Sequence, residues 1–170
     1  SGFHEPYLMG ANRRAGVGAP DYVKYMLSRP VKVQPGSEFV YSTADSILAG
    51  RMVEKAVGKR LSEYLYERFF EPLGQGFPIW ENCPQGHPIG GGGMFMTLSN
   101  MLKIGQVYLM DGKWKGQQLV DPAWIKEATA KQIETPNPGN DIWVCGYGYQ
   151  FWRNPYEDSY RADGAYGQLT

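Results

Sequence analysis

The sequence is poor in the residues that build metal sites and disulfide frameworks. Its 170 residues include 2 Cys and 2 His. Cys83 and His87 are the only soft ligands close together in the chain, so we expect no metal site and no cofactor. Whether Cys83 pairs with Cys145 stays open.

Net charge is absent as well. The 17 Lys and Arg residues balance 17 Asp and Glu residues, which leaves no basic footprint for nucleic acid or an anionic membrane. No apolar run approaches the length of a membrane span. The glycine run 90–93 lacks the lysine spacing of a phosphate-binding loop, because Lys103 is too distant. We therefore expect no nucleic acid, no membrane span and no nucleotide.

Aromatic residues, in contrast, are plentiful. They make up 14% of the chain, with 12 Tyr and 5 Trp. Such rings build a core whose polar tips need partners, or they line a ligand cleft. Composition does not choose between these alternatives, but 42% hydrophobic and 20% charged residues are typical of a globular protein.

The apolar periodicity predicts helices separated by loops. Pro20 opens a short helix, and Pro30 stops it, with Leu27 on its inner face. A long helix carries Met52 inward, with Ser42 or Thr43 as N-cap and Gly58 past its end. Further helices are predicted from about Ser62 to Pro72, from Thr97 or Ser99 to Gly112, and from Asp121-Pro122 with Trp124 inward.

The C-terminal part has the pattern of strands. Tyr147, Tyr149 and Phe151 alternate on one side, a turn follows near Asn154-Pro155, and residues 160–170 again favour a strand. The fold class is therefore α+β and mostly helical, with a helical lobe over 1–145 and two or three antiparallel strands over 146–170. Exposed strands at a sheet edge also predict a homodimer.

Several motifs occur in a fixed order along the chain. They are Pro35-Gly36, Tyr41-Ser42-Thr43, Ile47-Leu48-Ala49-Gly50, Val57-Gly58, Glu71-Pro72-Leu73-Gly74, Gly90-Gly91-Gly92-Gly93, Asp121-Pro122-Ala123-Trp124, Tyr147-Gly148-Tyr149 and Gly164-Ala165-Tyr166-Gly167-Gln168. This ordered set resembles the β-lactamase-related serine hydrolases, which include penicillin-binding proteins and class C β-lactamases. The resemblance implies the β-lactamase/transpeptidase-like fold, and periplasmic or secreted location is suggested by the family alone.

The family's nucleophile is the serine of a Ser-x-x-Lys motif. No Ser-x-x-Lys occurs upstream of Tyr41. The resemblance therefore implies an internal fragment that lacks the nucleophile segment, and we expect this chain alone to be inactive.

Tyr41 is the residue to which the resemblance assigns proton transfer. An attacking serine needs a base within hydrogen-bond reach, and a phenol serves only where cations favour the phenolate. The family draws such a cation from its Ser-x-x-Lys lysine. The alternative is that Tyr41 is one more packed ring.

Two positions depart from the family pattern. Thr43 stands where many relatives have Asn, and it carries one hydroxyl donor instead of an amide; alternatively it is only an N-cap. Ala162 stands where relatives have Lys or His before Thr-Gly, which removes a partner for a substrate carboxylate. Both changes favour an ester or amide over a β-lactam as the small-molecule substrate.

The remaining candidates are also assigned by resemblance. The backbone N–H of Ala165 would form half an oxyanion hole, while Gly91, Gly92, Asp163, Gly164 and Tyr149 would border the substrate. Asp163 next to Gly164 is equally typical of a turn, and Tyr149 of sheet packing. The two functional hypotheses are a serine hydrolase segment acting through an acyl-enzyme, and a non-catalytic binding or sensing module of the same fold.

Overall fold

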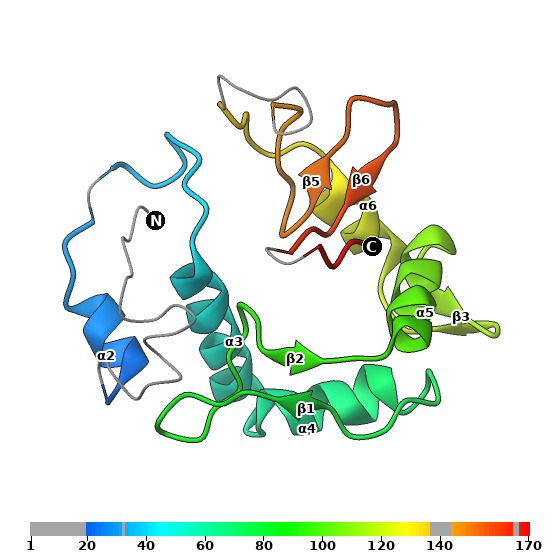
Figure 1. The fold of residues 1–170 in the computed structure, drawn as a ribbon, viewed down its shortest axis with the longest axis horizontal. Coiled ribbons are helices and arrows are strands. Elements are labelled where there is room, and N and C mark those ends of the chain that lie inside the picture. The colour runs from blue at the N-terminus through cyan, green and yellow to red at the C-terminus, as the bar shows by residue number, and fades with distance from the viewer. Residues whose placement is uncertain (1–19, 32, 137–143, 165–166) are drawn as a thin grey trace. The chain divides into compact units, whose positions relative to one another are not determined.

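The computed structural model describes residues 20–31, 33–136, 144–164 and 167–170. Within these ranges, helices alternate with short antiparallel strand pairs (Figure 1), so the chain has an α+β fold. It divides into two compact units between Met96 and Thr97. In the described ranges no helix has the length and apolar character to cross a bilayer.

The first unit is built on one long helix. Its helical elements are α2 (Tyr22–Leu27), α3 (Thr43–Val57), α4 (Leu61–Leu65) and a π-helical continuation, η1 (Tyr66–Phe70). The sequence predicted the ends of α3 correctly, because Ser42 takes the N-cap position and Gly58 adopts φ 69°, the left-handed conformation that ends helices. The predicted helix after Ser62 begins at Leu61 and changes to π-helix at Tyr66.

The core of this unit lies between α2 and α3. Its buried residues are Tyr22, Met26, Ala44, Ile47, Cys83 and Ile89. Two expected core residues face outward instead, since Leu27 is 71% and Met52 is 72% exposed. In α2, which spans six residues, Tyr22 and Met26 occupy the single buried stripe at i and i+4, and Leu27 falls outside it. Both cysteines are thiols.

A glycine-rich turn lies directly against α3. The turn covers residues 90–93 and leads directly into β2 (Met94–Phe95), which pairs antiparallel with β1 (Ile79–Trp80). A Cβ atom on Gly90 would lie 2.4 Å from the carbonyl oxygen of Ser46, and the Cα atom of Gly90 lies 3.7 Å from the Cβ position of Gly50. Only glycine permits this backbone-to-backbone contact.

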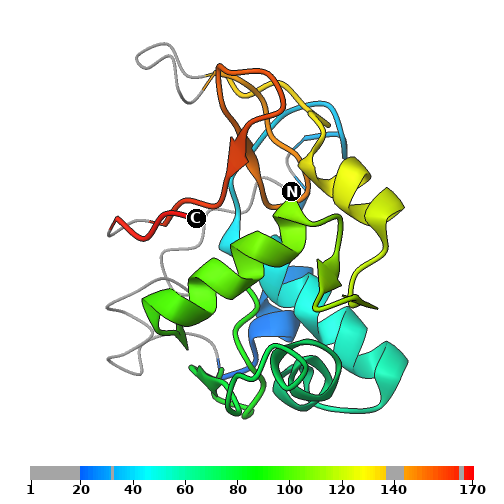
Figure 2. The same cartoon turned by 90° about the vertical axis from the view of Figure 1, so that its right-hand side faces the viewer.

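The second unit combines two helices with two hairpins. Its elements are α5 (Leu98–Leu109), β3 (Lys113–Trp114), β4 (Gln117–Gln118), α6 (Pro122–Thr129), β5 (Trp152–Arg153) and β6 (Tyr160–Arg161). Figure 2 shows α5 from the side, with its successive turns visible. Thr97 and Asp121 cap α5 and α6 through side-chain acceptors, as the sequence indicated. Each strand pairs antiparallel with its hairpin partner.

Two expectations for this unit are wrong. Trp124 is 48% exposed, because Ile125 and Ala128 fill the buried face of α6. The residues Tyr147, Tyr149 and Phe151 do not form one strand, because the N–H of Gly148 donates to the carbonyl of Phe151 and closes a turn between them. Gln150 takes a left-handed conformation in this turn, with φ 72°, which interrupts the alternating aromatic pattern.

Aromatic packing joins α5 to the last hairpin. The ring centroids of Tyr108 and Phe151 are 4.9 Å apart, and those of Phe151 and Tyr160 are 5.4 Å apart. Burial raises the pKa of the Tyr108 phenol, and the neighbouring Tyr160 phenol adds to this; burial also raises the pKa of Tyr160. Both hydroxyls therefore stay protonated at neutral pH.

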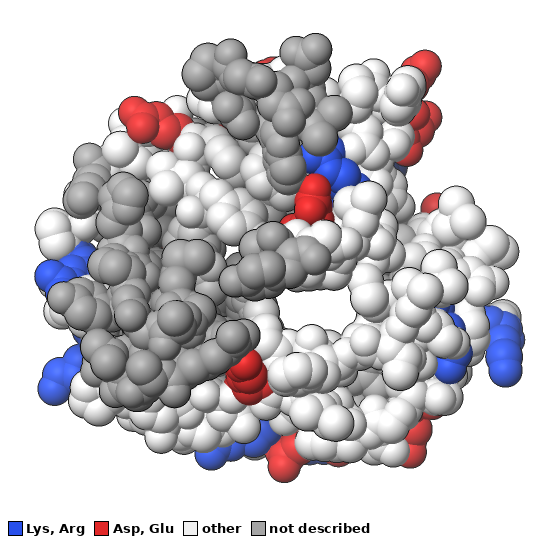
Figure 3. Space-filling model, viewed as in Figure 1, with Lys and Arg blue, Asp and Glu red and all other residues white. Residues whose placement is uncertain are grey.

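Among the residues that the structure describes, the face of the molecule in Figure 3 has no extended region of a single charge. Lys and Arg side chains are interspersed with Asp and Glu side chains over the face that it shows. This arrangement matches the zero net charge of the sequence.

Replacing Gly90 by Ala tests the contact with α3. We expect Gly90→Ala to lower the free energy of unfolding by about 1–3 kcal/mol, because the new methyl group must displace the Ser46 backbone. Gly76, which has open space around its Cβ position, provides the control: Gly76→Ala should change stability by no more than about 0.5 kcal/mol. Equal urea midpoints for the two variants would contradict the contact.

The buried Tyr108 phenol should make the protein sensitive to alkaline pH. Since its pKa is raised in the folded protein, the unfolded chain releases this proton first, and stability falls as the pH rises above about 10. Tyr108→Phe should therefore lose less unfolding free energy than the parent chain between about pH 9 and pH 11. Tyr156→Phe, at a residue 76% exposed, should behave like the parent chain in the same urea titrations.

Candidate active site

Tyr41 lies in extended chain immediately before the N-cap of the longest described helix. Its side chain is 59% exposed, so it is not a packed core ring. Helix α3 has 15 residues, and the partial positive charge at a helix N-terminus favours nearby anions. Tyr41 is therefore an exposed residue next to a helix end whose local field favours anions.

Thr43 and Gly91 are neighbours across the same helix end. Thr43 is the first residue of α3, with Ser42 in the N-cap position. A Cβ atom on Gly91 would lie 2.6 Å from Cγ2 and 2.9 Å from the carbonyl oxygen of Thr43. The structure thus brings these two predicted site residues together within the first unit.

The indole of Trp80 holds the turn that contains Gly92. Its Nε1–H donates to the carbonyl oxygens of Ile89 and Gly92, both at 2.9 Å. The N–H of Gly92 donates back to Ile89 at 3.2 Å. Because one donor fixes two carbonyls, the turn keeps a defined position against α3.

Asp163 and Gly164 lie on the turn that follows β6 in the second unit. Asp163 accepts from Nε of the buried Arg161 at 3.3 Å, and Gly164 donates to the carbonyl of Gln168 at 2.9 Å. The Gln168 side chain fills the Cβ position of Gly164. Asp163 also forms an antiparallel bridge with Leu169, so it is held both through its backbone and through Arg161; Ala165 lies outside the described residues.

Tyr149 lies against α6. Its ring stacks on Trp124 with centroids 5.5 Å apart, and its hydroxyl donates to Glu127 at 3.3 Å. With 41% of the residue exposed, one side of this pair is open to solvent. The pair forms a partly exposed aromatic platform.

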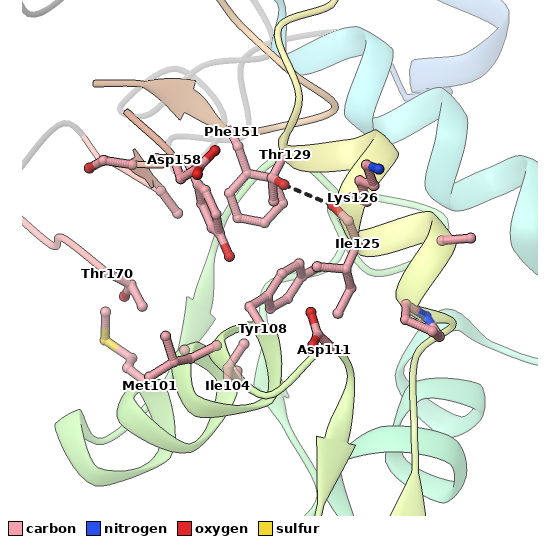
Figure 4. A pocket seen from close by; sticks show the side chains of 17 residues that line it. Met101, Ile104, Tyr108, Asp111, Ile125, Lys126, Thr129, Phe151, Asp158 and Thr170 are labelled. Atoms are coloured by element: carbon pink, nitrogen blue, oxygen red, sulfur yellow. Dashed lines mark hydrogen bonds between the residues drawn. The ribbon is translucent and has the colours of Figure 1, made fainter. Parts of the chain in front are cut away.

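The second unit also contains a cavity of about 1210 Å³. Figure 4 shows Met101, Ile104 and Tyr108 of α5 facing Ile125 and Thr129 of α6 across it. Phe151, Tyr160 and Ala162 add walls from the last hairpin, and Asp111 and Asp158 supply carboxylates. An apolar pocket with a few polar groups suits a small molecule with an apolar part.

Sequence reasoning missed this cavity. Its α5 residues Met101, Ile104 and Tyr108 recur at helical spacing, from which the sequence predicted only a helix. The spacing does mark the face that α5 turns toward Ile125, but apolar periodicity does not distinguish a filled core from a pocket. Of the predicted site residues that the structure describes, none lines this cavity.

No metal centre emerges from the described part of the chain, where no group of three or more His, Cys, Asp or Glu could hold an ion.

Comparison with known proteins places the chain in a family. The family model named Beta-lactamase matches residues 1–170. The Lovastatin esterase of Penicillium rubens is 38% identical over 55 residues, which are 32% of this chain and 14% of that protein.

Solved structures share the fold. A Bacillus anthracis protein designated a candidate 6-aminohexanoate-dimer hydrolase matches with a TM-score of 0.77 and 20% identity, over 99% of this chain and 47% of its own. The D-amino acid amidase of Ochrobactrum anthropi SV3, complexed with D-phenylalanine, matches with a TM-score of 0.59 and 20% identity, over 86% of this chain and 49% of its own. This chain thus spans about half the length of these structures.

The likeness in structure shows a fold, and the family model adds the sequence pattern along the whole chain. Because that pattern extends over residues 1–170 and agrees with the order of motifs around Tyr41, this protein belongs to the Beta-lactamase family, whose matched relatives are named as an esterase, an amidase and a hydrolase.

Proposed function

We propose that the chain is part of a serine hydrolase that cleaves an ester or amide through an acyl-enzyme. In this proposal Tyr41 transfers the proton, Thr43 and the backbone N–H of Ala165 contact the reacting group, and the nucleophilic serine belongs to a segment that this sequence does not contain. Gly91, Gly92, Asp163, Gly164 and Tyr149 border the substrate.

The exposure of Tyr41 beside the start of α3 is the observation that carries the proposal. A proton-transfer residue must lie within hydrogen-bond reach of the reacting atoms, and Tyr41 is 59% exposed beside the N-terminal end of α3. The contact between Thr43 and Gly91 supports a shared border of the site at this helix end.

Substrate class follows from what the chain lacks. Ala162, which is exposed, offers no cation to a substrate carboxylate, and Thr43 offers no amide. Both features disfavour β-lactams and peptide carboxylates, whereas an uncharged ester or amide needs neither. The apolar cavity next to Ala162 supports a substrate with an apolar part.

The same two departures favour a second candidate, a non-catalytic binding or sensing module. A fluorophosphonate probe distinguishes the candidates when it is applied to a longer product that includes the sequence before Ser1. Labelling of a serine in Ser-x-x-Lys supports the enzyme, and an unlabelled protein that still binds esters supports the module.

Removing the Tyr41 hydroxyl should slow the longer enzyme. We expect Tyr41→Phe to lower kcat/KM for a p-nitrophenyl ester by about 10²–10⁴-fold, the range typical of a lost general acid–base group. Tyr64→Phe, which changes a tyrosine of α4, is the matched control and should keep full activity. Equal rates for both variants would exclude proton transfer by Tyr41.

The 170-residue chain alone should be inactive. It contains no Ser-x-x-Lys motif, so neither an activated serine nor its lysine partner is available. Purified chain and its Tyr41→Phe variant should hydrolyse p-nitrophenyl acetate at the same background rate. Faster turnover by the unmodified chain would contradict the assignment of the nucleophile to another segment.

The last strands are proposed to support a homodimer. Ala162 and Thr170 pair through their backbones, and Leu169 between Gln168 and Thr170 is 60% exposed. An exposed apolar edge invites pairing with a second chain. Sedimentation velocity should show a concentration-dependent dimer that Leu169→Lys weakens, whereas Met110→Lys, at a residue 53% exposed, leaves it intact; a monomer at all concentrations would refute it.

A further inference from the structure

A second cavity lies in the first unit, apart from the Tyr41 motif. It has a volume of about 1320 Å³ and lies between α2, the C-terminal half of α3 and the start of α4. Its apolar wall consists of Val23, Leu27, Leu48 and Met52. Leu27 and Met52 are more than two-thirds exposed, so this wall is open to a ligand.

The far end of the cavity gathers positive charge around one carboxylate. Glu54, which is 7% exposed, accepts from Arg51 and lies 2.8 Å from Nδ1 of His87. The guanidinium groups of Arg51 and Arg60 both contact the same imidazole nitrogen. The carboxylate of Glu54 therefore contacts one guanidinium and the imidazole, and the imidazole contacts both guanidiniums.

The three acidic residues that line the cavity accept hydrogen bonds from backbone N–H groups. Asp21 accepts from the N–H of Lys24 at 3.0 Å, Glu63 from that of Arg60 at 3.1 Å, and Glu54 from that of Leu61 at 3.0 Å. The described lining holds five Lys and Arg residues against three acids. Lys59 pairs with Glu67, whereas Arg51 and Arg60 each carry several N–H groups, of which only those on Nη1 are directed at Glu54 or His87. These two guanidiniums therefore retain donors for a ligand.

Arg51 supplies a second, independent sign of a missing acceptor. Within the described residues its Nε atom is buried and makes no hydrogen bond. A buried N–H donor without an acceptor is unfavourable. An oxyanion beside Arg51 would accept from this donor and neutralise part of the surplus charge.

We propose that this cavity binds an oxyanion on an apolar body, with a carboxylate or phosphate bridging Arg51 and Arg60 and an aliphatic chain along Leu27, Leu48 and Met52. Guanidinium groups suit this role because their planar donors match the geometry of both anions. The site is separate from the proposed hydrolytic function and does not depend on it.

The pKa of His87 should change when an anion binds in the cavity. Burial lowers its pKa below the ordinary value; the charge of Glu54 opposes this, and the charges of Arg51 and Arg60 add to it. A bound anion counters the two arginines, so the pKa of His87 should rise. By linkage, binding should tighten as the pH falls.

The test uses the full 170-residue chain, with hexanoate, hexyl phosphate and acetate as probes. Binding is followed by calorimetry and by the NMR titration of His87, which is one of 2 histidines and is assigned with His87→Gln. We expect both hexyl probes to bind more tightly than acetate and to move the His87 titration to higher pH. The stronger hexyl ligand identifies the preferred head group.

Variants separate a specific site from general attraction. Arg60→Gln, at an exposed position, should weaken hexanoate binding by about tenfold, the effect of losing one charge-assisted hydrogen bond. Lys113→Gln removes an exposed charge on β3 and should leave binding unchanged. Arg51→Gln is included if its circular dichroism matches the parent chain. Absence of binding, equal affinity for acetate and hexanoate, or equal affinity in Arg60→Gln and Lys113→Gln would overturn the proposal.

Discussion

The direct backbone contact between the glycine-rich turn and α3 is the constraint on which the first unit depends. Gly90 approaches the Ser46 carbonyl and Gly50, and Gly91 approaches Thr43, at separations that exclude any side chain. This contact fixes the first turns of α3 against β1 and β2, and therefore fixes the direction in which the chain enters the helix. Tyr41 lies two residues before that helix, so a backbone contact without side chains orients the proposed proton-transfer residue.

The buried carboxylate of Glu54 connects α3 to the start of α4 and to the loop that contains His87. Glu54 on α3 accepts from the N–H of Leu61 at the start of α4 and pairs with His87. Burial opposes its ionisation, but the Leu61 hydrogen bond and the guanidinium of Arg51 lower its pKa below the ordinary value. A buried charge is tolerated only with such partners, so one residue joins two helices and a loop. The cations that make Glu54 tolerable also exceed it in charge, and the surplus creates the polar end of the second cavity.

Residue patterns predicted the long elements and failed for the short ones. The caps at Thr97 and Asp121 follow from local side-chain hydrogen bonds, and the end of α3 follows from the left-handed conformation of Gly58; sequence motifs record both directly. Strands β1 to β4 were missed because two residues carry no measurable alternation, and their pairing depends on contacts across the chain. The sequence wrongly predicted that Trp124 and Met52 are buried. Apolar character alone does not indicate which apolar residues of a helix lie on its narrow buried face. For the proposed site, sequence order supplied Tyr41, Thr43 and Gly91 as candidates, and the structure brings Thr43 and Gly91 into contact. The Arg51–Glu54–His87 cluster has no pattern in sequence, since it forms only when α3 meets the loop after Cys83.

The energetics of a phenol explain why the Tyr41 motif needs more than this chain provides. A tyrosine hydroxyl ionises near pH 10, so forming phenolate at neutral pH requires roughly 4 kcal/mol of electrostatic stabilisation. A helix N-terminus supplies about 0.3–1 kcal/mol at an exposed position, and Tyr41 is exposed. Ala162 contributes no charge, and the guanidiniums of Arg51 and Arg60 are already directed toward Glu54 and His87. The shortfall must come from a nearby cation and from exclusion of water, which strengthens its field. In this family a Ser-x-x-Lys lysine is a group of that kind, so the proposed function needs one segment with that motif to supply both the nucleophile and the cation.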